Sequence, residues 1–413
     1  MLKIAVIDSN YRKDQFHSLA KSWILWEMQK IGIEQTSKED ADFLLCTVSS
    51  QQGIGDLKAV LKGANKKAKI ILGGGGAWAP AIFEKIADLI CVGEGQRFLR
   101  TFLTYGYEEA AKLPEAWVYG EKREVVPYSD GFPFDCPPLL HPDGAVRVFA
   151  SRSCKKKCLF CQTGWEQAYK INPNIDKLQK NVDELLKKGK KVVCVTNDGA
   201  EESIRINGQQ EFISASYEYL KKMDISRAIA KSVRIGVEGV SERLRSAVKK
   251  PIDNDGLCKL SFDALAKGVG VRWFFVNGLP YETNNDYEEL KYLVRQIKKI
   301  SKGVIMMNFH SFVPQPATPL SVIPLVDSYW EPFEDFRKWF FDGMGFTRRI
   351  QIVAPAQYKG RMERAKESMC ANEEELRRGW FENDNANWRV KYLLTTEQRR
   401  EIARKYIKEV SNA

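Results

Sequence analysis

The sequence has few of the features that mark several common classes of protein. Only three of its 413 residues are histidines, and they are scattered, which disfavours a histidine-rich metal site. No apolar run reaches the roughly 18 residues that a membrane-spanning helix needs. The first residues lack the basic, apolar and small-residue regions of a secretory signal peptide. We therefore expect a cytoplasmic protein with no membrane partner.

Charge and cysteine content narrow the partners that the chain could have. It carries 64 Lys and Arg against 53 Asp and Glu, a net charge of +11. This excess favours an anionic partner such as nucleic acid, although interleaved acidic residues make simple solubility an alternative explanation. Nine cysteines in a chain without a secretory signal are expected to be buried thiols, metal ligands or catalytic groups rather than disulfides.

Residues 1–105 are expected to form a Rossmann-like α/β domain with a parallel sheet. Apolar, β-branched runs alternate there with stretches of helical length; the runs lie at 4–7, 43–48, 70–72 and 89–92. Each run ends in a polar or glycine-rich loop, and open α/β sheets bind ligands at the carboxyl ends of their strands. The run Gly73–Gly76 allows a close approach of the backbone to another group. It does not match the dinucleotide-binding glycine pattern.

The rest of the chain divides into three parts. Residues 106–143 are rich in proline and aromatic residues, which indicates an ordered linker. Residues 144–320 alternate strand and helix signals again, which predicts a barrel-like or open parallel sheet. The expected strands lie at 145–151, 191–197, 232–238, 271–277 and 304–313. Residues 321–413 are expected to form a mostly helical C-terminal domain.

Three cysteines lie within eight residues of one another directly after an expected strand: Cys154, Cys158 and Cys161. A loop at that position can direct three thiolates toward one centre, and thiolate sulfur suits iron–sulfur clusters and zinc. A structural zinc ion would need a fourth ligand, such as Cys136 or His141. Three cysteines alone suit a 4Fe-4S cluster in which one iron stays open to a cofactor or substrate.

The spacing Cys-x3-Cys-x2-Cys, with the aromatic Phe160 before the last cysteine, resembles the motif of the radical S-adenosylmethionine (radical SAM) superfamily. Arg152 and Ser153 resemble the Arg-Gly that precedes the motif in many members, with serine in place of glycine. The residues after the motif, Gln162–Gly164, resemble the Cys-Gln-x-Gly of a cobalamin-associated branch. The resemblance implies that the three cysteines hold the cluster and that Phe160 belongs to the cofactor site.

Further segments in the expected order carry the same resemblance. Residues 193–202 lie where members bind the amino group of S-adenosylmethionine, which implies this role for Asn197 and Asp198; the alternative is a simple turn. Glu238 ends a segment that resembles the strand whose polar residue binds the ribose, and Lys250 falls where relatives contact the cofactor carboxylate. The alternative for Glu238 and Lys250 is a surface ion pair.

Two more segments resemble the methylthiotransferase and coproporphyrinogen-oxidase-like branch. Gly278–Thr283 matches its Gly-Leu-Pro-Gly-Glu-Thr turn with Tyr281 in place of a glycine, and Asn308–Pro319 resembles its last-strand signature. The resemblance covers about 145–320 and implies a partial (β/α)6 TIM-like barrel. Within the last strand, His310 is expected to be a core histidine, or alternatively a polar contact in a pocket.

Residues 1–105 resemble the cobalamin-binding-type domain that precedes this barrel in some members. That domain often supplies a cobalt-ligating histidine from Asp-x-His-x-x-Gly, which this chain lacks, and His17 lies in a stretch of helical length. We therefore expect that this domain serves for packing or for substrate binding and does not bind cobalamin. A cobalamin without a histidine ligand is the alternative.

The resemblance implies a radical SAM enzyme, isomerase or transferase. An electron donor such as flavodoxin or ferredoxin reduces its cluster, and S-adenosylmethionine then yields a 5′-deoxyadenosyl radical that abstracts hydrogen from a substrate carbon. Cys46 and Cys91 are too few for the second cluster of methylthiotransferases, and Cys370 stands alone in the last part of the chain. Sulfur insertion of that kind is therefore disfavoured.

Basic stretches and aromatic residues near expected strand ends bear on the substrate. Lysines would bind phosphates, and Trp165, Tyr169 and Trp273 would stack on bases, which predicts modification of a nucleic-acid base or nucleotide. The alternatives need no ligand: the lysines could lie at solvated helix ends, and the tryptophans could pack in the core. Modification of a peptide or small natural product is the second enzyme hypothesis, and an iron–sulfur electron carrier is the non-enzymatic one.

Overall fold

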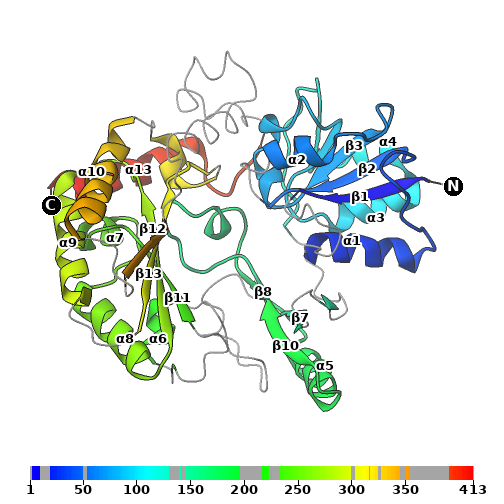
Figure 1. Ribbon diagram of the computed structural model, residues 1–413. Helices are drawn as coiled ribbons and strands as arrows, with labels where there is room; N and C mark the ends of the chain where they lie inside the picture. Colours follow the sequence, from blue (N-terminus) through cyan, green and yellow to red (C-terminus); the bar gives the residue numbers. More distant parts are fainter. Residues whose placement is uncertain are drawn as a thin grey trace. The chain divides into compact units, whose positions relative to one another are not determined.

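The computed structural model forms two compact units, each described here by itself (Figure 1). The described residues are 2–9, 19–49, 54–129, 139–140, 145–195, 216–222, 225, 232–298, 303–315, 317–323, 327–344, 350–353 and 390–412. The first unit comprises Met1–Arg152, Trp165–Val195 and Glu363–Thr395. The second comprises Ser153–Gly164, Thr196–Met362 and Thr396–Ala413. No helix in the described ranges is long and apolar enough to span a bilayer.

The first unit contains a five-stranded sheet whose order follows the chain. Its strands are β1 (Ile4–Asp8), β2 (Phe43–Thr47), β3 (Lys69–Gly73), β4 (Leu89–Cys91) and β5 (Ala116–Val118). The first four are parallel, as the sequence predicts, and β5 adds an antiparallel edge that the sequence does not reveal. One face packs against α1 (Leu19–Lys30), α3 (Gln96–Tyr105) and α4 (Tyr107–Ala111), while α2 (Ile54–Val60) connects β2 with β3.

Six further parallel strands alternate with helices along the chain, which is the pattern of a partial (β/α)6 TIM-like barrel. In the first unit, β7 (Ala145–Phe149) pairs with β10 (Lys191–Val195), and α5 (Ile175–Lys187) connects them. The same unit holds the short antiparallel strands β6 (Leu139–Leu140), β8 (Ser151–Arg152) and β9 (Lys170–Ile171).

The other four parallel strands form the sheet of the second unit. Their order is β11 (Ser232–Glu238), β12 (Gly270–Asn277), β13 (Ile305–Ser311) and β14 (Ile350–Val353). The helices are α6 (Tyr217–Leu220), α7 (Glu242–Ala247), α8 (Asn254–Ala266), α9 (Asn284–Lys298), α10 (Glu331–Lys338) and α13 (Thr396–Asn412). Short helical turns η7 (Pro319–Val322), η8 (Asp327–Trp330) and η9 (Trp339–Met344) lie near α10 and α13 in this unit.

Strand β14 is a strand within the range for which the sequence predicts mostly helices. Its four residues, Ile-Gln-Ile-Val, are too few for a convincing alternation, and only their parallel pairing with β13 makes them a strand. The sequence therefore predicts five of the six barrel strands. The expected domain limits at 105, 143 and 320 stay predictions.

Side chains alternate between two faces of the sheet in the second unit. Trp273 is fully buried and donates from Nε1 to Ser261 Oγ of α8 over 3.1 Å. The ring of Phe309 packs on Phe333 of α10, with 4.9 Å between centroids. Figure 1 shows α8, α9 and α10 along one side of this sheet. Residues of the opposite parity, such as Arg272, point to the other face.

Candidate active site

Backbone contacts within the second unit hold the loop that carries the three cysteines. The Leu159 N–H donates to the Val248 carbonyl over 3.2 Å, and the Leu320 N–H donates to the Leu159 carbonyl over 3.2 Å. The Gln162 N–H donates to Gln315 Oε1 over 2.9 Å. The loop is therefore attached both to the end of α7 and to the segment that follows β13.

Two positions of this loop have special backbone requirements. Ser153, which stands where relatives carry glycine, has a φ of 62°, in the left-handed region that favours glycine. Its Oγ donates to the Thr163 carbonyl over 2.6 Å. A Cβ added at Gly164 would lie 2.6 Å from the Lys156 carbonyl oxygen, so the loop closes through an approach that needs glycine.

Glu238 and Lys250 interact electrostatically with the thiols of Cys158 and Cys161. Cys154 and Cys158 are buried, and Cys161 is half-buried. Burial raises the pKa of Cys158 to about 12; the charge of Lys250 opposes this rise, and Cys161, Glu238 and Cys154 reinforce it. Burial likewise raises the pKa of Cys161, on which Glu238 and Lys250 also act. Five of the predicted site residues, the three cysteines with Glu238 and Lys250, therefore interact electrostatically, and their roles as cluster and cofactor ligands stay predictions.

The three thiols are chemically suited to a 4Fe-4S cluster. Among the described residues, no group of three or more His, Cys, Asp or Glu side chains converges closely enough to hold one metal ion. A 4Fe-4S cluster has several irons for its thiolates to bind, so they need not meet at one atom. Cys136 and His141, which would complete a zinc site, lie outside the described residues.

Glu238 and Lys250 form an ion pair of 2.7 Å, and only about 15% of each side chain is exposed. The pair lies directly over Gly236, where an added Cβ would be 2.7 Å from Lys250 Nζ and closer still to Glu238 Oε1. Glu238 has a φ of 71° at a point where the register between β11 and β12 shifts, and Lys249 has a φ of 62°. Left-handed backbone at two such residues indicates strain that the surrounding structure maintains.

Arg245 positions the segment that ends in Lys250, and sequence reasoning overlooked it. Its side chain is fully buried and donates to the carbonyls of Ile252 over 2.6 Å and Gly239 over 3.2 Å, and to Asn254 Oδ1. Burial lowers the pKa of this guanidinium, which nearby carboxylates oppose. Its place between Glu238 and Lys250 in the sequence is the only signal that would have pointed to it.

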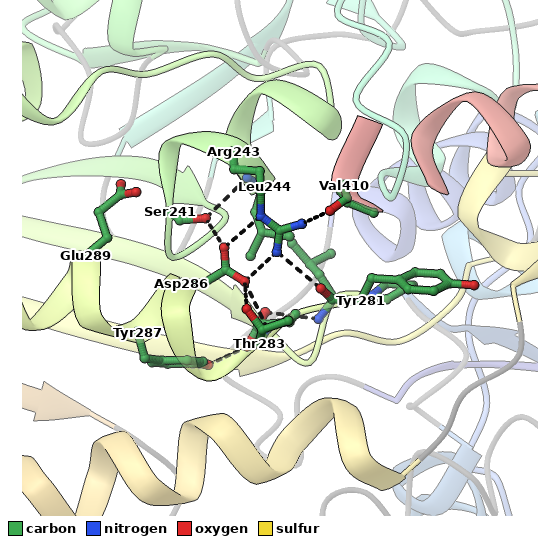
Figure 2. A network of polar contacts seen from close by, with 12 residues as sticks. Ser241, Arg243, Leu244, Tyr281, Thr283, Asp286, Tyr287, Glu289 and Val410 are labelled. Carbon is green, nitrogen blue, oxygen red and sulfur yellow. Dashed lines mark hydrogen bonds and ion pairs between the residues drawn. The ribbon is translucent and has the colours of Figure 1, made fainter. Parts of the chain in front are cut away.

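A second polar network joins the start of α7 to the turn after β12 (Figure 2). Asp286 accepts hydrogen bonds from Ser241 Oγ over 2.5 Å and from both the N–H and the Oγ1 of Thr283 over 2.9 Å. Arg243 pairs with Asp286 over 2.5 Å and also donates to the Tyr281 carbonyl and to a carbonyl near the end of α13. These contacts hold the segment after Glu238 in place.

The turn that resembles Gly-Leu-Pro-Gly-Glu-Thr is built around Glu282. Tyr281, which replaces the glycine, keeps a left-handed φ of 63°. The buried carboxylate of Glu282 accepts the N–H groups of Gly278 and Leu279 over 3.1 and 3.2 Å, and the Tyr287 hydroxyl over 2.5 Å. Burial raises the pKa of Glu282 to about 8, although these hydrogen bonds oppose the rise. The contacts of Glu282 make it a structural residue of this turn.

Several other predicted residues lie elsewhere than expected. His310 is exposed rather than in the core, and its ring stacks on Phe274 with 5.8 Å between centroids. Trp273 and Trp165 are buried, which favours core packing over base stacking. The reason is strand parity, because Trp273 points to the helices and His310 to the opposite face. Phe160 is half-buried.

Some predicted residues lie outside the part of the chain that the structure describes. Asn197 and Asp198, expected to bind the amino group, lie outside the described residues, as does His17. For these residues the assigned roles stay predictions.

In the first unit, Arg152 is bound to an acidic loop residue that sequence reasoning did not single out. Its Nε donates to Glu94 Oε1 over 2.6 Å, and Glu166 lies 3.6 Å away. Burial disfavours the charged form, yet both carboxylates raise the pKa of Arg152. Gln167 Nε2 also donates to Glu94 over 2.6 Å. The arginine of the motif thus ties β8 to the loop after β4.

The glycine run of the first unit approaches neighbouring backbone. A Cβ at Gly74 would lie 2.5 Å from the Val48 carbonyl oxygen, and one at Gly75 would lie 2.6 Å from that of Ser49. At the same carboxyl edge, Ser9 Oγ and Thr47 Oγ1 are buried and have no hydrogen-bond partner among the described residues. Buried hydroxyls of this kind are groups that a bound ligand would satisfy.

Solved structures share this fold. TsrM, a radical SAM methyltransferase of Kitasatospora setae solved with cobalamin and a 4Fe-4S cluster, has a TM-score of 0.53 and 12% identity. That comparison covers 99% of this chain and all of TsrM. OxsB, a cobalamin-dependent radical SAM enzyme solved with aqua-cobalamin, has a TM-score of 0.50 and 15% identity over 84% of this chain and 56% of its own. At such identities the likeness concerns the fold.

Sequence comparisons cover shorter stretches. The ribosomal protein uS12 methylthiotransferase RimO of Flavobacterium psychrophilum is 24% identical over 184 residues, which is 38% of this chain and 42% of RimO. An uncharacterised protein of Methanocaldococcus jannaschii is 38% identical over 96 residues, 22% of this chain and 21% of its own. The chain thus spans less than half the length of these curated relatives. No family model matches it.

The shared fold agrees with what the motifs of the chain predict. The N-terminal parallel sheet, six further parallel strands and the loop with three cysteines occur together in one chain. The chain thus has the fold of solved radical SAM enzymes with a cobalamin-binding domain, and part of its sequence is similar to RimO.

Proposed function

We propose that the chain is a radical SAM enzyme and that it binds a 4Fe-4S cluster through Cys154, Cys158 and Cys161. When bound, the cluster would supply the electron that cleaves S-adenosylmethionine to the 5′-deoxyadenosyl radical, which abstracts hydrogen from a substrate carbon. The observation that carries the proposal is the attachment of the cysteine loop to the end of α7, two residues before Lys250, where the half-buried ion pair of Glu238 and Lys250 acts on the thiols of Cys158 and Cys161. A cationic and an anionic side chain beside a cluster site suit a zwitterionic cofactor.

The side chains of the second unit have separate tasks in this proposal. Lys250 would attract the carboxylate of S-adenosylmethionine as a point charge, because an ammonium group cannot form a bidentate fork. Glu238 would accept hydrogen bonds from the ribose hydroxyls. In the structure each side chain holds the other in place, so cofactor binding would exchange one 2.7 Å ion pair for contacts to the cofactor. Asn197 and Asp198 are proposed to bind the amino group, and Phe160 to lie beside the cofactor.

We further propose that the first unit binds cobalamin without a histidine ligand. The orphaned hydroxyls of Ser9 and Thr47 at the carboxyl edge support this, as does the presence of cobalamin in the TsrM and OxsB structures. Bound cobalamin would supply methyl transfer, which makes the enzyme a transferase, whereas its absence favours isomerisation. Cobalt retained after purification, measured by elemental analysis, tests this point.

A nucleic-acid base or nucleotide is the proposed substrate, and the net charge of +11 supports an anionic partner. A small natural product is the second candidate, because TsrM was solved with a tryptophan substrate. Binding to nucleic acid that weakens steeply with salt would favour the first, and binding that ignores salt the second. A flavodoxin or ferredoxin in the cytoplasm is the proposed electron donor.

Anaerobic reconstitution tests the proposal. Mössbauer and EPR spectra should reveal a 4Fe-4S cluster, and mass analysis should find 5′-deoxyadenosine or a methylated product after addition of S-adenosylmethionine and a reductant. The Cys154, Cys158 and Cys161 triple alanine variant should lose both signals. Cys258→Ala, which removes a half-buried thiol of α8, should keep them. A triple variant that still cleaves S-adenosylmethionine would refute the proposal. A substrate product of unchanged mass would indicate isomerisation.

A further inference from the structure

Among the described residues, the helices α8 and α10 pack on one face of the sheet of the second unit, and the opposite face is called the open face below. Side chains alternate between the two faces of a strand, so those of the open face point away from the buried side chains on the Trp273 side. Trp273 itself packs on α8. The members used below are Arg234, Gly236, Arg272, Phe274 and His310. The ion pair over Gly236 lies on the same face, because a Cβ at that position would point at it.

Two arginines of the open face lie directly opposite each other. Arg234 of β11 pairs in register with Arg272 of β12, and neighbouring strands are about 4.8 Å apart. Arg234 is exposed and Arg272 is half-buried, and neither makes a hydrogen bond or ion pair with another described residue. Like charges directly opposite on neighbouring strands repel each other. An anion between the two guanidinium groups would remove this repulsion, and their planar forks match phosphate oxygens.

An aromatic surface follows the arginines toward the carboxyl edge. Phe274 lies two residues beyond Arg272 on the same face, a rise of about 6.6 Å. Its ring stacks on that of His310 with an angle of 5° between the planes. Glu238 and Lys250 lie over Gly236, which is level with Phe274 in the register. Along the strands the face therefore presents paired cations, then flat rings beside the proposed cofactor ligands.

We propose that Arg234 and Arg272 form a phosphate-binding subsite for a substrate that also carries a planar ring. The phosphate lies between the two guanidinium groups, and the ring lies against Phe274 and His310. The substrate then extends toward the site of the ion pair. The inference rests on the proposed function and narrows its substrate to phosphorylated compounds with a planar group.

Titration of the full chain with simple probes tests the subsite. Phenyl phosphate should bind more tightly than inorganic phosphate, and benzoate should bind more weakly than either, by calorimetry at constant ionic strength. The Arg234→Gln, Arg272→Gln double variant should lose at least about tenfold in affinity for phenyl phosphate, because two charge-assisted contacts disappear. Lys259→Gln removes an exposed charge on α8 and should not change the titration. Phe274→Ala should reduce the preference for phenyl phosphate over phosphate.

Thermal unfolding provides a readout that separates binding from folding. Without phosphate, the melting temperature of the double variant should equal that of the wild type or exceed it by about 1 °C, because the repulsion between the two arginines is relieved. Equal phenyl phosphate affinity in the double variant and the wild type would overturn the inference, as would benzoate binding as tight as that of phenyl phosphate. A wild type that binds phenyl phosphate through the arginines but never S-adenosylmethionine would instead refute the proposed function alone.

Discussion

Replacing Gly236 by alanine should separate cofactor binding from folding. The added Cβ would lie 2.7 Å from Lys250 Nζ and nearer still to Glu238 Oε1, distances that real Cβ contacts almost never show. Both atoms are the ends of flexible side chains, so these side chains should swing aside while the backbone of β11 stays in place. The substitution therefore breaks the ion pair without removing either charged group.

The expected loss of stability is small. Losing a charge-assisted contact costs about 1.5–3 kcal/mol, and alanine in place of a strand glycine returns roughly 0.5–1 kcal/mol. The free energy of unfolding should thus fall by about 1–2 kcal/mol, against a typical total of about 5–15 kcal/mol. The protein should stay folded, while affinity for S-adenosylmethionine should fall at least about tenfold because both proposed ligands are displaced.

The assay combines calorimetric titration of S-adenosylmethionine into anaerobically reconstituted protein with urea unfolding. Gly55→Ala in α2 is the matched control, because a Cβ there meets nothing within 4 Å. It should leave cofactor affinity unchanged. A folded Gly236→Ala protein with wild-type affinity would show that Glu238 and Lys250 do not contact the cofactor.

Three further predictions concern positions around this site. Tyr281→Gly should be more stable than Tyr281→Ala by about 1 kcal/mol in urea unfolding, because φ is 63° there; equal stability would contradict the left-handed backbone. The pKa of Glu282 is raised to about 8, so its contribution to stability is fully present below the ordinary value of 4.5 and is lost as pH rises through 8. Urea unfolding between pH 5 and 8 should show this fall, at most about 1.4 kcal/mol per pH unit, and Glu282→Gln should flatten it; an unchanged slope would refute the assignment. Arg245→Met should cost roughly 2–4 kcal/mol because buried carbonyls lose their donor, and it should weaken cofactor binding in titrations. A variant as stable as the wild type would show that Arg245 does not hold the segment before Lys250.

Patterns within short stretches of sequence were sufficient to predict the cysteine motif and most of the helices and strands. The spacing of Cys154, Cys158 and Cys161 predicted a loop after a strand, and the structure has β7 and β8 just before it. Four parallel strands of the first sheet and five of the barrel follow from apolar runs. These features depend on neighbours along the chain, which is why a single sequence reveals them.

The direction of side chains and the distant contacts were decided by tertiary structure. Which parity of β12 is buried depends on where α8 packs, so Trp273 lies in the core, as the alternative to base stacking had it, and His310 is exposed instead of buried. The strand β14 exists only through pairing with β13, and the role of Arg245 depends on carbonyls that the chain brings around it. The left-handed backbone at Ser153 and Tyr281 persists although glycine is absent. Sequence patterns carry local propensity, whereas burial, pairing and strain are properties of segments that meet only after the chain has folded.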